Sequence, residues 1–579
     1  MSFPSSKARG RGIRDRYVRV LNNMCVRRLQ GPTFVVVILL FSLACVGCNR
    51  RPSRRGTTKL HSDAGTAQAA RRPVLPASLK LPQIAPKPAK TEPYGGTLRV
   101  HLESEPPHLN PLQDQLQVIQ RVVSGLVYET LIECRENQYR PGLAESWEVS
   151  SDGLRLTFKL RSGARWHDDR GFSGLDVQAS FEPLLRSSNQ TIFHAMLEDV
   201  EGVDVLPERG ARFRLRRPSD LVLRALCEIP ILPAETLRKA GSAVTQLGRQ
   251  PVGTGPFRFA AWERGKRIRL VRAHPAERPQ PPYLDEIVFE IENDGSKALV
   301  RTRRGEIDIL PRVLEVLYPD QVTPATLRNT LDLWWLTPDR ISFIVPNHRR
   351  GPLGDARFRH ALSLLWDRTR FAEEIHHGLT RPVGAPAFAQ FPADPLDRKQ
   401  AIALLDAAGF RDNDGDGVRD VGGAPIRLTF LVPAGARSLA AEVKGYALDL
   451  RRAGLLLDTA SVDASSLQAR LDRGDFDLAI LTWEGRPDED PRPLFGNQGQ
   501  LAFSGFRSDP LQALLDQLPL APGPAARKPE LQRIGEWLAN ERPVIFLYRH
   551  DVPALVGKRV HGLAGIGDRL DLRSVWVEP

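Results

Sequence analysis

Residues 412–420 have the residue types and the spacing of a cation-binding loop. Carboxylates stand at positions 1, 3, 5 and 9 of a calcium-type loop, namely Asp412, Asp414, Asp416 and Asp420. Gly417 occupies position 6, where such loops turn sharply. Position 12, which supplies two oxygen ligands in strong calcium loops, is Gly423. The spacing therefore predicts weak calcium binding or none, and a hairpin that holds no metal is the alternative.

Motifs with catalytic or phosphate-binding spacing are absent from the sequence. It contains no GxxxxGK(S/T), HExxH or GxSxG segment. His167 stands in a WHDD sequence, which suits a turn with local hydrogen bonds better than metal ligation. His376 and His377 are adjacent, so on a helix they would point in different directions. An enzyme is therefore not expected, although catalytic triads leave no fixed sequence order.

Two polar loops follow strands in the second half of the chain. Three apolar runs, separated by two helical patterns, predict strands at residues 426–432, 455–462 and 476–483. This βαβαβ order predicts that the three strands are parallel. Ligands in open parallel sheets bind beyond the carboxyl ends of the strands, which here lead into residues 433–437 and 483–490. The alternative for each segment is a solvated surface loop.

The first half shows the alternation of half-buried strands. Leu98, Val100 and Leu102 alternate with polar residues, which predicts a strand. Residues 147–160 predict two strands joined by a turn at Ser151-Asp152-Gly153. A further strand is expected at residues 287–291. The chain therefore predicts two α/β lobes.

Composition agrees with a large soluble body. Of the 579 residues, 41% are hydrophobic and 26% are charged, which excludes a disordered tail or a multi-span membrane protein. The formal net charge is +13. Residues 1–92 hold 18 Lys and Arg against three acids, a net of +15, so residues 93–579 carry −2. No basic groove and no nucleic-acid partner are therefore expected.

An apolar stretch near the front predicts export. Residues 34–47 are apolar and follow Arg27 and Arg28, and they are too short to cross a bilayer comfortably as a helix. They suit the core of a signal peptide spanning residues 1–48. Met24 is a candidate for the true start, since 33 residues are long before such a core.

The end of this stretch resembles the lipobox of bacterial lipoproteins. Val46-Gly47-Cys48 would make Cys48 the acylated first residue, and Cys45 is a second candidate. A plain secretory signal or a single anchoring helix is the alternative. Residues 49–92 are rich in Pro, Ala and basic residues without an apolar period, which predicts a disordered tether. The remaining cysteines, Cys134 and Cys227, could pair after export, but sequence alone leaves this open.

Several segments in register resemble one known family. They are GGTLRV (95–100), SEPPHLNP (104–111), PGLAESWEVSSDGLRLTFKLRSGARWHDD (141–169), PVGTGPFRF (251–259), GPLGDARFRHALSLLWDR (351–368), DNDGDGVRD (412–420) and ERPVIFLYRHDVPALVGKRVHG (541–562). These resemble the signature segments of the family-5 extracellular solute-binding proteins, the dipeptide, oligopeptide and nickel receptors of ABC importers. The resemblance covers essentially all of residues 95–579.

The resemblance implies a two-lobed α/β receptor of the type II periplasmic-binding-protein fold, whose lobes close on a solute. Lobe I would span residues 93–293 and return as residues 542–579, and lobe II would span residues 294–541. Two crossing strands near Glu290 and Phe546 would form the hinge. No cofactor and no chemistry on the solute are implied.

The resemblance carries over to binding residues only in part. In dipeptide-binding members a carboxylate soon after Trp-x-Gly pairs with the peptide amine, but here Trp483-Glu484-Gly485 is followed by Arg486. The carboxylates that could replace this anchor are Glu484, Asp488, Glu489 and Asp490. Trp483 would line the pocket or belong to the core. Arg437 lies near the position at which these relatives bind the peptide carboxylate, and such a pair favours an anionic group.

The sequence thus predicts a monomeric, lipid-anchored periplasmic or extracytoplasmic receptor. It would deliver a peptide-like solute to the permease subunits of an ABC importer. An acidic or amine-free solute stays open, because the amine anchor is missing. A solute sensor or chaperone-like scaffold that serves no transport is the alternative function.

Overall fold

The computed structural model describes residues 95–578 with short gaps. The gaps are residues 114–115, 136–137, 187–192, 194, 208, 239–246, 274–281, 328, 339, 390, 485–489, 519–523 and 567–568. The predicted signal peptide, Cys48 and the tether lie outside the described residues. No helix in the described ranges is long and apolar enough to span a bilayer.

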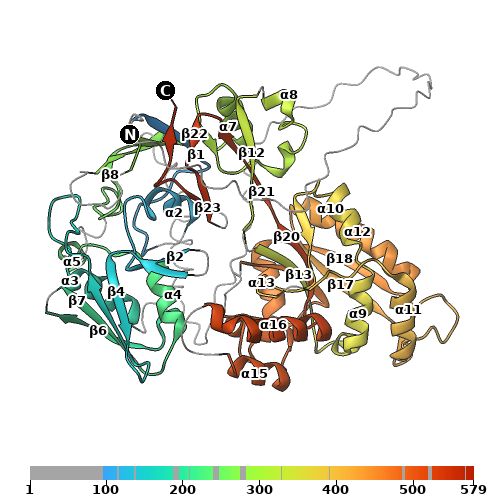
Figure 1. The fold of residues 1–579 in the computed structure, drawn as a ribbon. Helices are drawn as coiled ribbons and strands as arrows, with labels where there is room; N and C mark the ends of the chain where they lie inside the picture. Colours follow the sequence, from blue (N-terminus) through green and yellow to red (C-terminus); the bar gives the residue numbers. More distant parts are fainter. Residues whose placement is uncertain are drawn as a thin grey trace, which may run out of the picture. The chain divides into compact units, whose positions relative to one another are not determined.

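Seven strands form the first sheet, in the order β12-β21-β11-β1-β10-β9-β8 (Figure 1). Their bounds are β1 Thr97–Leu102, β8 Phe257–Glu263, β9 Arg267–Arg272, β10 Glu286–Ile291, β11 Ile309–Leu310, β12 Leu331–Leu336 and β21 Val552–Gly557. β1 pairs in parallel with β10 and β11, and the other pairings are antiparallel. Alternation along β1 buries Leu98, Val100 and Leu102 in one core with the apolar side of α2 (Gln117–Val123). The predicted strands 98–102 and 287–291 are confirmed.

A smaller antiparallel sheet with the order β4-β5-β7-β6 follows β1 in the chain. Its strands are β4 Ala144–Val149, β5 Arg155–Leu160, β6 Val200–Leu206 and β7 Gly210–Leu215. The turn at residues 151–153 joins β4 to β5 as predicted. Beside this sheet, Cys134 in β2 (Ile132–Arg135) forms a disulfide with Cys227 in α4 (Asp220–Glu228), with Cα atoms 5.7 Å apart. Whether Cys134 and Cys227 pair was left open by the sequence, and the structure shows that they do.

Six strands form the second main sheet, in the order β14-β20-β13-β19-β17-β18. Their bounds are β13 Arg340–Pro346, β14 Thr380–Pro382, β17 Arg427–Pro433, β18 Leu456–Val462, β19 Leu478–Glu484 and β20 Ile545–His550. β17 pairs in parallel with both β18 and β19, which confirms the predicted βαβαβ unit with α12 (Arg437–Arg452) and α13 (Ala464–Arg473) as its helices. Gly474 ends α13 in the left-handed conformation with φ 68°, which glycine adopts without strain.

The chain crosses between the two main sheets twice. The first crossing joins the end of β12 at Leu336 to the start of β13 at Arg340, and the second runs from β20 to β21 through Asp551. Residues 294–336 therefore belong with the first sheet, which differs from the predicted lobe boundary at residue 294 and from a crossing near Glu290. Asp294 caps the amino end of α7 (Gly295–Arg303), so the predicted boundary at residue 294 coincides with the start of a helix and not with a crossing between the sheets. The strand near Phe546 belongs to the second sheet, and the chain crosses only after it.

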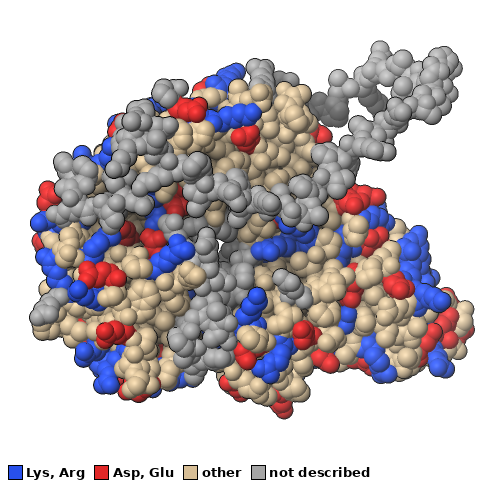
Figure 2. Space-filling model, viewed as in Figure 1, with Lys and Arg blue, Asp and Glu red and all other residues tan. Residues whose placement is uncertain are grey.

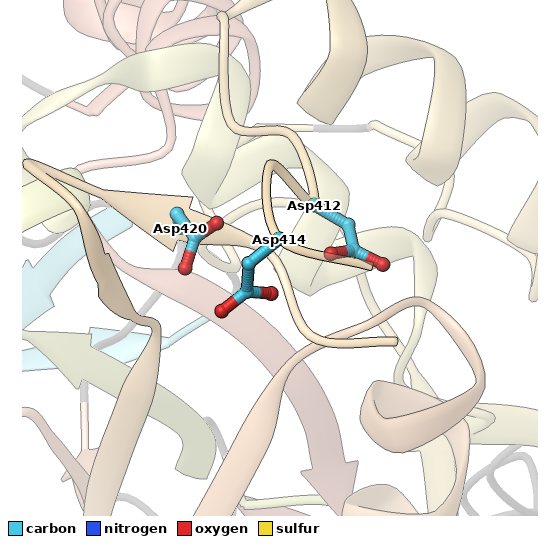
Figure 3. Close-up of side chains that lie close together, drawn as sticks. All are labelled: Asp412, Asp414 and Asp420. Carbon is cyan, nitrogen blue, oxygen red and sulfur yellow. The ribbon is translucent and has the colours of Figure 1, made fainter. Parts of the chain in front are cut away.

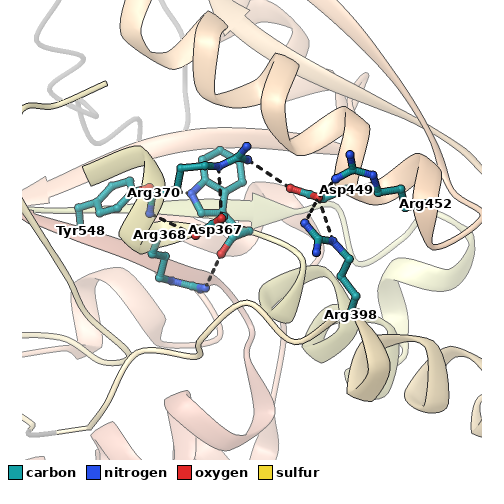
Figure 4. A network of polar contacts seen from close by, with 8 residues as sticks. Asp367, Arg368, Arg370, Arg398, Asp449, Arg452 and Tyr548 are labelled. Carbon is teal, nitrogen blue, oxygen red and sulfur yellow. Dashed lines mark hydrogen bonds and ion pairs between the residues drawn. The ribbon is translucent and has the colours of Figure 1, made fainter. Parts of the chain in front are cut away.

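A buried carboxylate joins the helices beside the second sheet (Figure 4). Asp449 of α12 is 1% exposed and accepts hydrogen bonds from Arg370 of α10 (Arg368–Glu374) at 3.3 Å and from Arg398 of α11 (Arg398–Ala407) at 2.7 Å. Arg452 donates to the same carboxylate at 3.0 Å. Three cations from three helices therefore share one anion, which fixes α10 and α11 against α12.

Replacing Asp449→Asn should remove the charge that these guanidinium groups share. We expect the free energy of unfolding in urea to fall by about 1 to 3 kcal/mol, because Arg370, Arg398 and Arg452 lose the buried carboxylate charge that they share. The matched control is Asp458→Asn, whose carboxylate is 54% exposed beside Arg427. That pair should contribute about 0 to 1 kcal/mol. Equal losses in the two variants would contradict this assignment.

Candidate functional site

The carboxyl ends of the three parallel strands of the second sheet meet at one edge. Pro433, Val462 and Glu484 end β17, β18 and β19 there. The antiparallel neighbours bring three more residues to this edge, namely Arg340 at the start of β13, His550 at the end of β20 and Thr380 at the start of β14. Both crossings to the first sheet leave from the same edge (Figure 1). This edge, called the carboxyl edge below, is where the parallel topology predicts a ligand.

Several buried polar atoms at and near the carboxyl edge have no hydrogen-bond partner among the described residues. Five such atoms are Ser342 Oγ, Thr380 Oγ1, Arg381 Nη2, His550 Nε2 and Asp551 Oδ1. Buried polar atoms are almost always hydrogen-bonded in folded proteins. A group of them at one strand edge therefore marks a place where a polar ligand would supply the missing bonds.

The local potential at this edge is positive. Figure 2 shows Lys and Arg side chains gathered over β13 and β20 near the centre of the view. Burial, and then the charges of Arg340 and His376, lower the pKa of His550 to about 3. Burial, and then Arg340, also lower the pKa of Arg312, which follows β11 of the first sheet. Both groups therefore resist a further positive charge.

A histidine connects the second sheet with the segment before β12. His376 Nε2 lies 2.6 Å from Glu442 Oε1 of α12, and His376 Nδ1 lies 3.2 Å from Glu315 Oε1 of η3 (Glu315–Leu317). Burial disfavours the imidazolium, but the hydrogen bonds and charges of the two carboxylates outweigh it and raise the pKa of His376 to about 9. His376 is therefore charged at neutral pH and holds two carboxylates from two parts of the chain.

This pairing should make stability depend on pH. The pKa of His376 rises from 6.5 to about 9 on folding, so its contribution is complete below pH 6.5 and is lost as the pH rises through 9. Between pH 6 and pH 10 we expect the difference in unfolding free energy between the wild type and His376→Gln to shrink by about 3 kcal/mol. Urea titrations at several pH values measure this difference. The exposed neighbour His377, replaced by Gln, is the control, and a pH-independent difference for His376→Gln would refute the assignment.

Of the predicted binding residues that the structure describes, Arg437 and Trp483 lie next to the carboxyl edge. Arg437 is the first residue of α12 and is exposed. Trp483 is half-buried in β19, with its ring edge-on to Phe388 and Phe495 at centroid distances of 6.3 and 6.1 Å. Asp490 is buried and accepts from Arg492 Nε at 2.8 and 2.9 Å, so its charge is already matched. The Glu484 side chain, Gly485, Arg486, Asp488 and Glu489 lie outside the described residues.

The aspartate-rich segment brings together three of its four predicted ligands (Figure 3). Asp412, Asp414 and Asp420 each place one carboxylate oxygen within 4.8 Å of the others. Asp412 also accepts from the backbone N–H groups of Gly415 and Gly417 at 2.7 and 2.9 Å. Asp416 instead accepts from the Val418 N–H at 2.6 Å and is not part of this cluster. The cluster offers oxygen ligands of the kind that calcium takes, but few of them.

We expect calcium to bind this loop weakly at most. In ten millimolar calcium the melting temperature should be about 1 to 3 °C higher than in a chelator. A ligand whose concentration is close to its Kd stabilises the folded state by about RT. Asp414→Asn should abolish the increase, whereas Asp416→Asn should keep it. Equal melting temperatures in calcium and in chelator would identify a hairpin that holds no metal.

Sequence reasoning missed the residues that dominate the electrostatics of the edge. Arg340 stands just before an apolar run, but only the pairing of β13 between β19 and β20 brings it to the site. His376 was considered only as a metal ligand, and its two carboxylate partners are 61 and 66 residues away. His167 hydrogen-bonds the backbone of Gly253 and Gly255, which are 86 and 88 residues away, and not the local groups that its turn sequence predicts.

The chain is similar to known solute-binding proteins. A sequence model of the bacterial extracellular solute-binding proteins, family 5 (middle), matches residues 138–501, which is more than half of the 579 residues. The di/tripeptide-binding protein 2 of Pseudomonas aeruginosa is 26% identical over 401 residues, covering 62% of this chain and 70% of that protein. The heme-binding protein A of Haemophilus influenzae is 26% identical over 441 residues, covering 68% of this chain and 76% of that protein.

A solved structure shows the same fold. The oligopeptide-binding protein AppA of Bacillus subtilis, in complex with a nonapeptide, has a TM-score of 0.64 and 21% identity. The match covers 84% of this chain and 100% of that chain. This likeness confirms the predicted type II periplasmic-binding-protein fold.

Proposed function

Because the chain belongs to family 5 of the bacterial extracellular solute-binding proteins, we propose that it is the receptor of an ABC importer for a peptide-like solute. The solute binds at the carboxyl edge of the second sheet and is delivered to the permease. The observation that carries this proposal is that both crossings between the sheets leave from this edge. Rotation about the crossings would therefore enclose a solute bound there.

The contents of the edge support a binding role without chemistry on the solute. The described side chains there offer hydrogen-bond donors, acceptors and positive charge, which are the groups that orient a polar ligand. A peptide is favoured because one relative is a di/tripeptide-binding protein and AppA was solved in complex with a nonapeptide. The heme-binding relative and the di/tripeptide-binding relative are both 26% identical in sequence to this chain, so the percentage of sequence identity alone does not select the ligand.

Attachment to the membrane is part of the proposal. Cys48 ends the apolar segment 34–47 and would carry the lipid, and residues 49–92 would separate the body from the bilayer. Metabolic labelling with a fatty-acid analogue would locate the lipid. Labelling should vanish in Cys48→Ser and persist in Cys45→Ser. Labelling that persists in Cys48→Ser would exclude Cys48 as the attachment site, and a wild type without labelling would exclude the anchor.

A library of peptides with two to nine residues tests the ligand class. Binding of each peptide is measured by calorimetry and by tryptophan fluorescence. For a bound peptide we expect Arg437→Ala to weaken affinity by about 1 kcal/mol, or fivefold, because an exposed guanidinium contributes modestly to a carboxylate pair. Arg427→Ala is the matched control. Arg427 is the first residue of β17 and lies at the end of the strand opposite the carboxyl edge, whereas Arg437 comes shortly after the carboxyl end of the same strand. The absence of binding across the library, together with unchanged peptide uptake in a deletion strain, would rule out a peptide receptor.

A solute sensor or scaffold with the same fold is the second candidate. The observation that favours it is Arg486, which replaces the expected carboxylate after Trp483-Glu484-Gly485. Genes for a permease and an ATPase beside this one would support transport, whereas solute binding without uptake would support the sensor.

A further inference from the structure

Arg340 lies in the middle of the carboxyl edge. It is the first residue of β13 and pairs across the sheet with Glu484, the last residue of β19. The next residue, Ile341, pairs on the other side with Arg549 of β20. Arg340 therefore stands between the strand that leads into the predicted binding loop and the strand that crosses to the first sheet. The chain arrives at Arg340 from the first sheet, because β12 ends at Leu336.

The charge of Arg340 is not neutralised by the described part of the chain. Its guanidinium has no hydrogen bond or ion pair with a described side chain, and the residue is half-buried. The acids near its neighbours Arg312, His376 and His550 are already paired with other cations. Glu103 pairs with Arg121, Glu315 and Glu442 hold His376, and Asp551 binds Arg381 Nε at 2.5 Å.

Its neighbours increase the local positive charge. Arg312 and His550 both interact electrostatically with Arg340, and each interaction disfavours the charged form. His550 consequently stays neutral at physiological pH, and its buried Nε2 has no partner among the described residues. An unpaired guanidinium next to a neutral imidazole is a suitable receptor for a compact anion, because the first supplies charge and the second a hydrogen bond.

We propose that Arg340 binds an anionic group of the solute, with His550 Nε2 as its hydrogen-bonding neighbour, so that the receptor selects solutes that carry a carboxylate or a similar compact anion. This inference rests on the proposed binding of a solute at the carboxyl edge. It adds the class of solute and the residue that selects it.

Matched peptide pairs that differ in one carboxylate test the inference. In each pair one carboxylate, at the carboxyl terminus or on a side chain, is replaced by a carboxamide. For at least one pair the wild type should prefer the carboxylate by about 10- to 100-fold in calorimetry. Arg340→Gln should reduce this preference below about threefold without weakening the carboxamide, and Arg340→Lys should retain part of it. Arg350→Gln is the control, because Arg350 lies beyond the far end of β13 and pairs with Asp475 and Asp477.

The melting temperature without ligand gives a second readout. Arg340 has repulsive neighbours, so Arg340→Gln should leave the melting temperature equal or higher. The side chain of Glu484 lies outside the described residues, so Glu484→Gln is included. If Arg340→Gln and Glu484→Gln lowered the melting temperature equally, Arg340 would have an internal counter-ion and the inference would be overturned.

The experiment separates this inference from the proposed function. An unchanged carboxylate preference in Arg340→Gln, or no preference in the wild type, overturns the inference while peptide binding stands. If no peptide binds, the peptide assignment fails, and a panel of non-peptide carboxylates and phosphates is tested by thermal shift. A shift lost in Arg340→Gln then supports the inference, and the absence of any shift overturns it.

Discussion

Parallel pairing of β17 with both β18 and β19 brings three strand ends to one edge, and the rest of the site depends on this register. The opposite end of the sheet fixes the register. Asn347, which is 1% exposed, donates from Nδ2 to the carbonyls of Gly474 and Phe476 at 3.0 Å. Asp477 accepts from the Thr429 N–H at 2.7 Å. A slip of one residue would turn the inward side chains outward, so these buried bonds indirectly position Arg340 and His550 at the other end.

Local patterns in the sequence predicted a large part of this architecture. The βαβαβ unit, the hairpin at residues 151–153 and the strand at residues 98–102 follow from apolar period and turn residues, which are properties of neighbouring positions. The lobe boundary could not be found in this way. β11 and β12 pair with β1 and β21, and the pairing of β12 with β21 joins residues more than 200 positions apart. A helix cap at Asp294 carries no information about which sheet the next strand joins.

The candidate site shows the same division. Arg437 follows one predicted strand and Trp483 ends another, so both were predicted as binding residues from strand ends that are visible in the sequence, and their binding role stays a prediction. His376, Arg312 and Arg340 were not identified as partners, because their environment is set by charges that the fold brings together. Asp449, a buried ion beside the same sheet, is matched by three arginines. Five buried polar atoms at and near the carboxyl edge have no partner among the described residues, and natural proteins typically accept such local instability where they bind ligands.

The disulfide between Cys134 and Cys227 links maturation to cellular location. It closes a loop over a sequence separation of 93, which restricts the unfolded chain strongly. Such a bond persists in oxidising compartments, whereas in the cytosol the two cysteines are kept reduced. A copy that stays inside the cell therefore lacks this constraint, and the chain reaches its full resistance to unfolding and proteolysis only after it has left the cytosol.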